Sequence, residues 1–240
     1  MVFVYLLTFG LFVLLFTREV IAPASGASCD KRWRLFAGAI NILNIVVVLT
    51  AGVIFSGWID ANSLVTLPPR FGVIGTSFAV FLTAGFVTYW WHRLMHASDT
   101  IWRMVHQLHH SPSRVETLTA FYVHPLDSFA AAFLNAVVAY WILGASAWAT
   151  GLAFFYVSVF NLIAHADMRT PYWLGFFLQR PEMHRIHHER GAHRNNYGLP
   201  IFDMLFGTWC NPTGAPVACG FSEPNEYRVR DMLLMRDVGE

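Results

Sequence analysis

The chain has 240 residues, enough for one domain, and 55% of them are hydrophobic. Only 13% are charged, about half the share of a typical soluble domain, so the composition favours a membrane protein. A net charge of +1 gives no concentrated basic patch for nucleic-acid binding, and three cysteines without a CxxC pair indicate neither a disulfide framework nor a thiolate zinc site.

Five apolar runs come close to the length of about 20 residues that crosses a bilayer. They cover residues 2–16, 36–59, 71–91, 126–143 and 148–164. The first run is short, but no basic residue precedes it and no clear cleavage site follows at once, so we expect a retained membrane helix rather than a signal peptide. The last two runs flank a short link at Gly144-Ala145-Ser146 and are expected to form a helical hairpin.

The basic residues of the loops predict the orientation. The loop after the first run carries Arg18, Lys31, Arg32 and Arg34, whereas the loop between the second and third carries only Arg70. Because positively charged loops stay in the cytoplasm, the first loop is expected to be cytoplasmic. The third run then ends on that side at His92, and the hairpin returns there at His165.

The sequence therefore predicts an all-α polytopic bundle of about four to five membrane helices with a histidine-rich helical cap in the cytosol. We expect one fold in three parts: N-terminal membrane helices at 1–91, a catalytic region at 92–211 that includes the hairpin 126–165, and a polar C-terminal tail at 212–240 with a short amphipathic helix near residues 232–235. A bacterial inner membrane and the endoplasmic reticulum are both compatible with this topology.

All eleven histidines lie between positions 92 and 193, and most fall into motifs. The motifs are an HxxxH at 92–96, an HxxHH at 106–110, an NxxxH at 161–165 and a second HxxHH at 184–188. Residues three and four apart share a helix face, so each motif is expected to aim its imidazoles at one point. Neutral imidazole binds iron, zinc, copper and nickel.

The number of histidines indicates two metal ions. A zinc site takes three or four protein ligands, so nine histidines and an asparagine are too many for one ion. Shared between two ions, they leave four or five ligands each and room for a substrate or oxygen. A lone histidine near a membrane end is more often an interfacial residue, and this interpretation applies to His124 and His193 when each is considered alone.

The motifs resemble those of the fatty acid hydroxylase / sterol desaturase superfamily of membrane di-iron enzymes. The stretches that carry the resemblance are Tyr89-Trp90-Trp91-His92-Arg93-Leu94-Met95-His96, Trp102, His106-Gln107-Leu108-His109-His110-Ser111, Val123-His124-Pro125-Leu126-Asp127, His184-Arg185-Ile186-His187-His188, Asn196-Tyr197-Gly198 and Phe202-Asp203-Met204-Leu205-Phe206-Gly207-Thr208. They stand in the family's order and cover residues from about 85 to 210.

The resemblance implies two iron ions, with zinc as a substitute in purified protein, on the cytosolic face above a cavity for lipid. The implied ligands are His92, His96, His106, His109, His110, His165, His184, His187 and His188. Asn161 falls where related enzymes place a ligand or a water-mediated contact, and His124, Asp127 and Asp203 are expected to support the ligands from outside. His193 has no counterpart.

Two departures from the family pattern concern acidic residues. Related sequences often carry one in the span before the Tyr-Trp pair, where this chain has Gly85, Phe86 and Val87. The His-Pro pair is followed by Asp127 in place of the usual glutamate. A residue that orients a ligand imidazole must then come from elsewhere, with Asp127, Asp167, Glu182 and Asp203 as candidates.

The implied activity is hydroxylation, or alternatively desaturation, of a lipid such as a fatty acyl chain, a sterol or a carotenoid with O2. Two external electrons per turnover would come from a separate donor, such as cytochrome b5, a ferredoxin or a reductase, because the chain shows no segment typical of these proteins. Arg93, Arg103, Arg114 and Arg185 are candidate contacts for such a donor.

Three other functions are weighed against this one. A zinc metalloprotease would need HExxH, but Arg-Leu-Met separates His92 from His96. A metal transporter would place ionisable ligands near the middle of the membrane, whereas these histidines gather at the ends of the spans. A non-catalytic membrane protein that binds metal stays open as an alternative.

Overall fold

The computed structural model describes residues 2–26, 30–59, 63–65, 67–192, 194–214 and 217–239, and the side chains of all these except residues 2 and 56–59. His193 and Cys29 lie outside the described residues. The described part is helical and contains no sheet. It has one isolated antiparallel β-bridge, between Glu189 and Cys219. The predicted all-α fold is confirmed.

Five helices are long and apolar enough to cross a membrane, so the chain is an integral membrane protein. They are α1 (Val2–Ile21), α2 (Lys31–Ile59), α3 (Gly72–Ala97), α6 (Pro125–Ala136) with its π-helical continuation η4 (Val137–Ile142), and α7 (Ala147–His165). α1, α2 and α3 extend into polar sequence beyond the apolar runs, because a helix satisfies its own backbone hydrogen bonds in water as well as in lipid.

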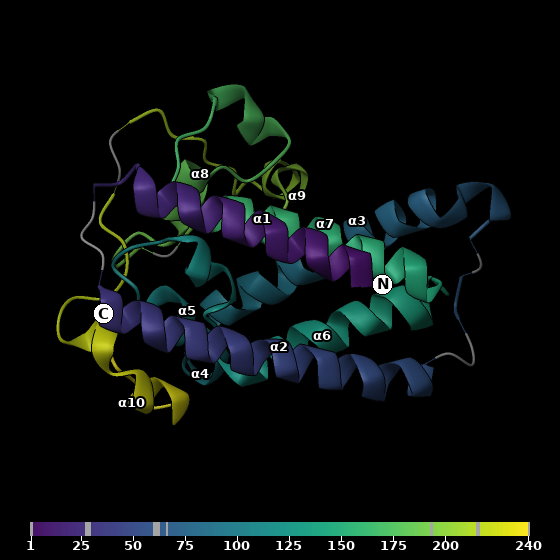
Figure 1. The fold of residues 1–240 in the computed structure, drawn as a ribbon, viewed down its shortest axis with the longest axis horizontal. Helices are drawn as coiled ribbons and strands as arrows, with labels where there is room; N and C mark the ends of the chain where they lie inside the picture. The colour runs from purple at the N-terminus through teal and green to yellow at the C-terminus, as the bar shows by residue number, and fades with distance from the viewer. Residues whose placement is uncertain are drawn as a thin grey trace.

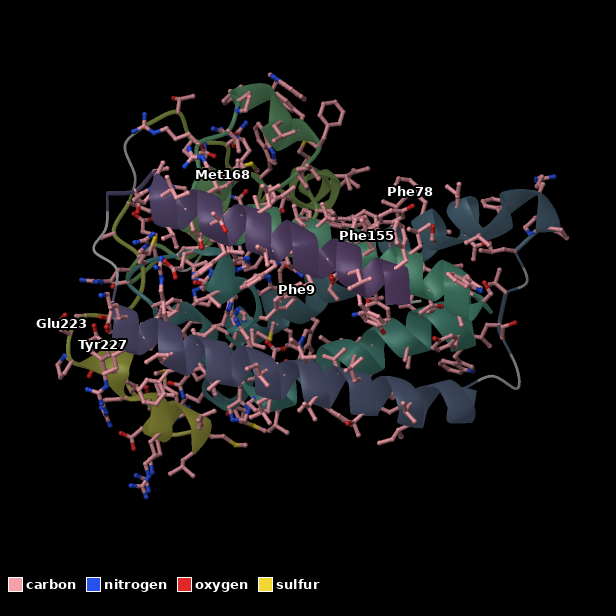
Figure 2. The ribbon with its side chains drawn as sticks, viewed as in Figure 1. Phe9, Phe78, Phe155, Met168, Glu223 and Tyr227 are labelled. Atoms are coloured by element: carbon pink, nitrogen blue, oxygen red, sulfur yellow. The ribbon has the colours of Figure 1, made fainter. Side chains whose placement is uncertain are left out.

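The long helices run roughly side by side along the long axis of the molecule (Figure 1). α2 packs mainly against α6, and α3 and α1 pack against α7. Small residues such as Ala84, Ala139 and Ala153 are buried where α3, η4 and α7 meet, which lets these backbones approach closely. Large apolar side chains face outward instead, with Phe9 65% and Phe78 53% exposed, as expected for a surface in contact with lipid tails (Figure 2).

One end of the bundle is closed by the link of the α6–α7 hairpin. Gly144 has φ +55°, and a Cβ there would lie 2.7 Å from Ser63 Oγ, so glycine suits this turn. The backbone N–H groups of Leu64 and Val65 donate to the carbonyls of Trp141 and Ile142 at 2.8 and 2.9 Å. The segment 63–65 is thereby fixed to the end of the hairpin.

The opposite end carries a cap of short helices. In chain order these are α4 (Asp99–Ile101), the π-helix η2 (Trp102–His106), α5 (Gln107–His110), the 3-10 helices η3 (Thr117–Phe121) and η5 (Tyr172–Phe176), α8 (Pro181–His187), α9 (Pro200–Leu205), the 3-10 helix η6 (Asn225–Tyr227) and α10 (Val229–Leu233); a further 3-10 turn, η1 (Pro69–Phe71), precedes α3 at the other end. Figure 1 shows α5, α8 and α10 at the same end of the bundle.

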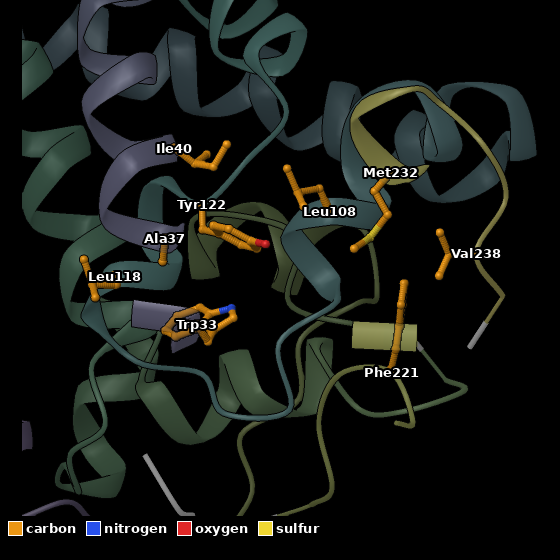
Figure 3. Close-up of a cluster of buried hydrophobic side chains, with 9 residues drawn as sticks. All are labelled: Trp33, Ala37, Ile40, Leu108, Leu118, Tyr122, Phe221, Met232 and Val238. Atoms are coloured by element: carbon orange, nitrogen blue, oxygen red, sulfur yellow. The ribbon is translucent and has the colours of Figure 1, made fainter. Parts of the chain in front are cut away.

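Three apolar residues near the C-terminus belong to the core of this cap. Phe221, Met232 and Val238 are at most 5% exposed and join Trp33 of α2 and Leu108 of α5 in one buried cluster (Figure 3). The segment expected to be a polar tail therefore also fastens the start of α2 to the histidine motif at 106–110.

Candidate metal centre

Nine histidines meet where the ends of α3 and α7 face α5 and α8. One group contains His92, His96, His106, His110 and His187, and a second contains His109, His165, His184 and His188. Within each group the ligand nitrogens all lie within 4.8 Å of one another, and seven of the nine residues are buried. Either group could therefore hold a metal ion. We call them the five-histidine group and the four-histidine group.

The structure corrects one expectation that the spacing of the histidine motifs gave. Each HxxHH was expected to aim at one point, but each contributes to both groups. His106 and His110 join the five-histidine group and His109 the four-histidine group, whereas His184 and His188 join the four-histidine group and His187 the five-histidine group. In each motif the two histidines four residues apart therefore belong to the same group. The third histidine directly precedes the last one, so it lies about 100° around the helix and faces the other group.

Two imidazoles of the five-histidine group present bare nitrogens to each other. Nδ1 of His92 donates to the Tyr197 carbonyl and Nδ1 of His187 to the Asn195 carbonyl, both at 2.7 Å. A neutral imidazole that donates from Nδ1 has a lone pair at Nε2, and the two Nε2 atoms lie 3.0 Å apart. Two acceptors this close repel each other unless a cation lies between or beside them, so the donor set fits a metal ion.

The four-histidine group repeats this arrangement. Nδ1 of His165 donates to the Asn161 carbonyl at 2.8 Å, and Nδ1 of His109 points to the Tyr122 carbonyl at 3.4 Å. Their Nε2 atoms are 3.3 Å apart, and Nε2 of His184 lies 2.8 Å from that of His165. These nitrogens also converge on one point, so a second ion fits here.

Burial keeps the imidazoles of the cap neutral. It lowers the pKa of His109, His110, His184, His187 and His188 well below the usual value, and the neighbouring imidazoles lower it further. A neutral imidazole is the form that binds a metal, because the protonated ring has no free lone pair.

A loop held by Asp203 and Asn196 supplies the carbonyls that orient the five-histidine group. Asp203 is fully buried and accepts hydrogen bonds from the backbone of Tyr197 at 2.8 Å and of Gly198 at 3.1 Å, and from Thr208 Oγ1 at 2.7 Å. Burial raises the pKa of Asp203 to about 6 in spite of these donors. Asn196 bonds the carbonyls of Met183 and Cys210, which ties the same loop to α8.

A buried ionic cluster fixes α8 to the end of α7. Asp167 accepts from Arg185 at 2.5 Å and from the backbone and hydroxyl of Ser25 at 2.8 and 2.7 Å. Glu19, at the end of α1, accepts from the backbone N–H groups of Asp167 and Thr117 at 3.0 Å each. Arg185 is 5% exposed, so it is not available as a surface contact for an electron donor, contrary to the expectation from sequence.

Arg114, the other arginine expected at a docking face, also lies in this cluster. It pairs with Glu116 at 3.0 Å and with Asp167 at 3.4 Å, and its side chain is only 9% exposed. Glu116 in turn accepts a bidentate pair from Arg34 of α2 at 2.7 and 2.8 Å. Arg93 and Arg103 remain as the candidates with more accessible side chains.

The other residues expected around the ligands have different positions. Asp127 lies 3.7 Å from Nδ1 of His106 and accepts from the Trp91 indole at 3.4 Å. His124 caps α6, because its Nδ1 accepts from the Leu126 backbone at 3.1 Å, and it contacts neither group through the hydrogen bonds of its ring. Asn161 contributes its backbone carbonyl to His165 and lines the adjoining cavity.

Sequence reasoning did not single out the Asn195 carbonyl or the Glu19 carboxylate. Asn195 and Asn196 have φ +63° and +49°, and an Asn-Asn pair tolerates this left-handed conformation better than most residues. That Asn-Asn pair was the available signal in the sequence. For Glu19 the signal was an acidic residue at the end of an apolar helix, which needs partners when buried.

A cavity of about 320 Å³ opens beside both groups. The histidines in its wall are His92 and His106 of the five-histidine group and His109, His165 and His184 of the four-histidine group. From there it extends between α3, α6 and α7 to Phe81 and Phe154. Its wall is mostly apolar away from the histidines, as in sites for lipid-like ligands.

Comparison with known proteins identifies relatives of this chain. The family model described as fatty acid hydroxylase matches residues 77–208, more than half of the chain. A very-long-chain aldehyde decarbonylase from Oryza sativa subsp. indica is 26% identical over 174 residues, which are 68% of this chain and 66% of the relative.

Two further relatives carry hydroxylase or monooxygenase names. A sphingolipid C4-hydroxylase from Schizosaccharomyces pombe is 28% identical over 130 residues, 52% of this chain and 44% of the relative. An alkylglycerol monooxygenase from Xenopus tropicalis is 30% identical over 159 residues, 62% of this chain and 33% of the relative. The chain thus spans less than two thirds of each of the three relatives, and no solved structure matches it significantly.

Proposed function

Because the chain belongs to the fatty acid hydroxylase family, we propose that it is a di-iron oxygenase that hydroxylates a lipid inside the membrane. The observation that carries the proposal is the pairing of two histidine groups with one apolar cavity whose wall includes histidines of both. A protein that only stored metal would have no need of a lipid-sized cavity beside the ions. Desaturation of the same kind of substrate is the alternative outcome of the same chemistry.

In this proposal the nine histidines hold two iron ions, five at one and four at the other. Bound there, the irons would supply the reduction of O2 and the oxidation of an unactivated C–H bond, which no amino-acid side chain can perform. The chain's own contribution is positional. The carbonyls of Tyr197, Asn195 and Asn161 fix three imidazoles with Nε2 inward, and the apolar wall aligns the substrate and excludes water.

The substrate in this proposal reaches the site from the bilayer. Candidate substrates are fatty acyl chains, sterols and carotenoids, since all are long and apolar. The cap is cytoplasmic in the orientation that the basic loops favour. Electrons come from a separate donor protein, such as cytochrome b5, a ferredoxin or a reductase, and the accessible Arg93 and Arg103 offer it cationic contacts.

The test is a metal count on protein purified in detergent under low oxygen, beside the double variant His109→Ala, His187→Ala, which removes one ligand from each group. We expect close to two irons per wild-type chain and loss of metal from the variant. His124→Asn is the matched control, because asparagine also caps a helix and His124 belongs to neither group.

A lipid screen for oxygen-dependent products follows on the iron-loaded protein. An oxidised lipid that requires O2 and reductant, and that the double variant does not form, would support the oxygenase. Two zinc ions in place of iron would support the two-metal cage and require reconstitution with iron before the screen. Absence of stoichiometric metal after that reconstitution would refute the proposal.

A further inference from the structure

A second, much smaller cavity adjoins the large one, and none of the described histidines lines it. It measures about 10 Å³, and Phe81, Ala84, Asn135, Phe154 and Val157 line both cavities. Phe81 precedes His92 by 11 positions on α3, which is about 16 Å at the rise of an α-helix. A volume of this size accommodates one water-sized group.

The wall of this small cavity contains a buried hydroxyl without a hydrogen-bond partner. Thr150 is 2% exposed, and its Oγ1 bonds to nothing in the described part of the chain. Two threonines in other membrane helices bond to their own helix: Thr8 donates to the Val4 carbonyl at 3.0 Å and Thr88 to the Ala84 carbonyl at 2.8 Å. Thr150 differs from these two threonines, although its side chain is more deeply buried than either.

Asn135 adds an acceptor to the same wall. Its Nδ2 donates to the Ala131 carbonyl at 2.7 Å, which leaves Oδ1 as the group that this side chain has to offer. Thr150 can donate one hydrogen bond and Asn135 can accept one. A hydroxyl group both accepts and donates, so it matches the pair, whereas a methyl group would leave both partners unsatisfied at a cost in binding.

We infer that Asn135 and Thr150 form a subsite for the hydroxyl group of a lipid alcohol. The inference rests on the proposed function, which makes the large cavity the substrate site, and it narrows the substrate class. The substrate binds with its hydroxyl at the end of the cavity distant from the histidines and presents to them a carbon farther along its chain. Thr150 and Asn135 determine specificity and take no part in the oxidation.

The experiment compares the binding of tetradecanol and tetradecane to the full chain in nanodiscs, at equal mole fractions in the lipid. Binding is read from the shift of the thermal unfolding midpoint with probe concentration, so it needs no turnover. We expect wild type to bind the alcohol about three- to tenfold more tightly than the alkane, as one or two neutral hydrogen bonds allow.

The variants Thr150→Val and Asn135→Leu should bring that ratio close to one without weakening the binding of tetradecane. Thr8→Val is the matched control, because it removes a membrane hydroxyl that is already bonded and does not line either cavity, so it should keep the ratio. Thr150→Val should also leave the midpoint without probe unchanged or higher, since it removes an unsatisfied buried hydroxyl.

Equal binding of alcohol and alkane by wild type would overturn the inference, and so would a ratio that survives in Thr150→Val. The latter would mean that only water occupies the small cavity. Metal content and oxygen-dependent product are measured on the same preparations. Two irons with product but without an alcohol preference would support the oxygenase and overturn the subsite. An alcohol preference without metal or product would support the subsite and overturn the oxygenase.

Discussion

The five-histidine group and the four-histidine group use the same motifs but are held in place by different parts of the chain. His92 and His187 are oriented by carbonyls of the loop at 195–197, which the nearby Asp203 holds through hydrogen bonds to its backbone. His165 is oriented by a carbonyl one turn earlier in its own helix. The orientation of His92 and His187 therefore depends on a tertiary contact with the C-terminal third of the chain, whereas that of His165 depends on the continuity of α7.

The ionic cluster adds to this difference. Asp167 follows the four-histidine ligand His165 by two residues and pairs with Arg185, which follows His184 by one. The four-histidine group is thus braced by charge pairs and the five-histidine group by a hydrogen-bonded loop. Disturbing one brace should affect one group more than the other, and this can be measured.

The largest effect is expected from removing one ligand of a single group. His92→Ala should lower the metal content from about two ions per chain to about one by emptying the five-histidine group, and His165→Ala should do the same for the four-histidine group. Metal analysis with Mössbauer spectra of iron-57-loaded protein would separate the two environments. Loss of both ions from either variant would show that the groups bind metal only as a unit.

The next largest effect is expected for Asp167→Asn. Removing this charge leaves Arg185 without its buried partner, so we expect a loss of about 3–5 kcal/mol in the free energy of unfolding, together with weaker metal binding in the four-histidine group. Ser25→Ala, which removes one of the donors to Asp167, should cost about 1 kcal/mol. Denaturant unfolding monitored by tryptophan fluorescence measures both, and equal effects of the two variants would contradict the bracing role.

Asp203→Asn should act on the five-histidine group. The amide would place a donor beside the N–H groups of Tyr197 and Gly198, so the loop that orients His92 would loosen, and the affinity for one of the two ions should fall about 10- to 100-fold. Competition with a chelator measures this affinity. Asp99→Asn, at an exposed carboxylate, is the control, and an equal loss at both ions would contradict a selective effect.

The smallest effect is expected from mild acid. The histidines of the cap have pKa values below that of the unfolded chain, so the unfolded state takes up protons first as pH falls. Stability and metal retention should be at their maximum above about pH 6.5 and decline below it. Metal content after dialysis across this range tests the sign, and retention that improves on acidification would contradict it.

The membrane character and the family could be predicted from the sequence because both depend on local pattern. Apolar runs of bilayer length and the order of the histidine motifs do not require knowledge of distant contacts, and both predictions are confirmed. Helix ends were less predictable: α1 continues to Ile21 past Arg18 because Glu19 finds partners in Thr117 and Asp167, which no local pattern reveals.

The sequence by itself determined the residue types and the i, i+4 pairs that stay together, since these follow from helical periodicity alone. Only the tertiary structure decided that each HxxHH divides between two groups, because the division depends on which helix faces which. The same holds for Arg185 and Phe221, which a polar sequence context marked as surface or tail and which packing made part of the interior. Burial is a property of neighbours distant in sequence, and those neighbours are set by the fold.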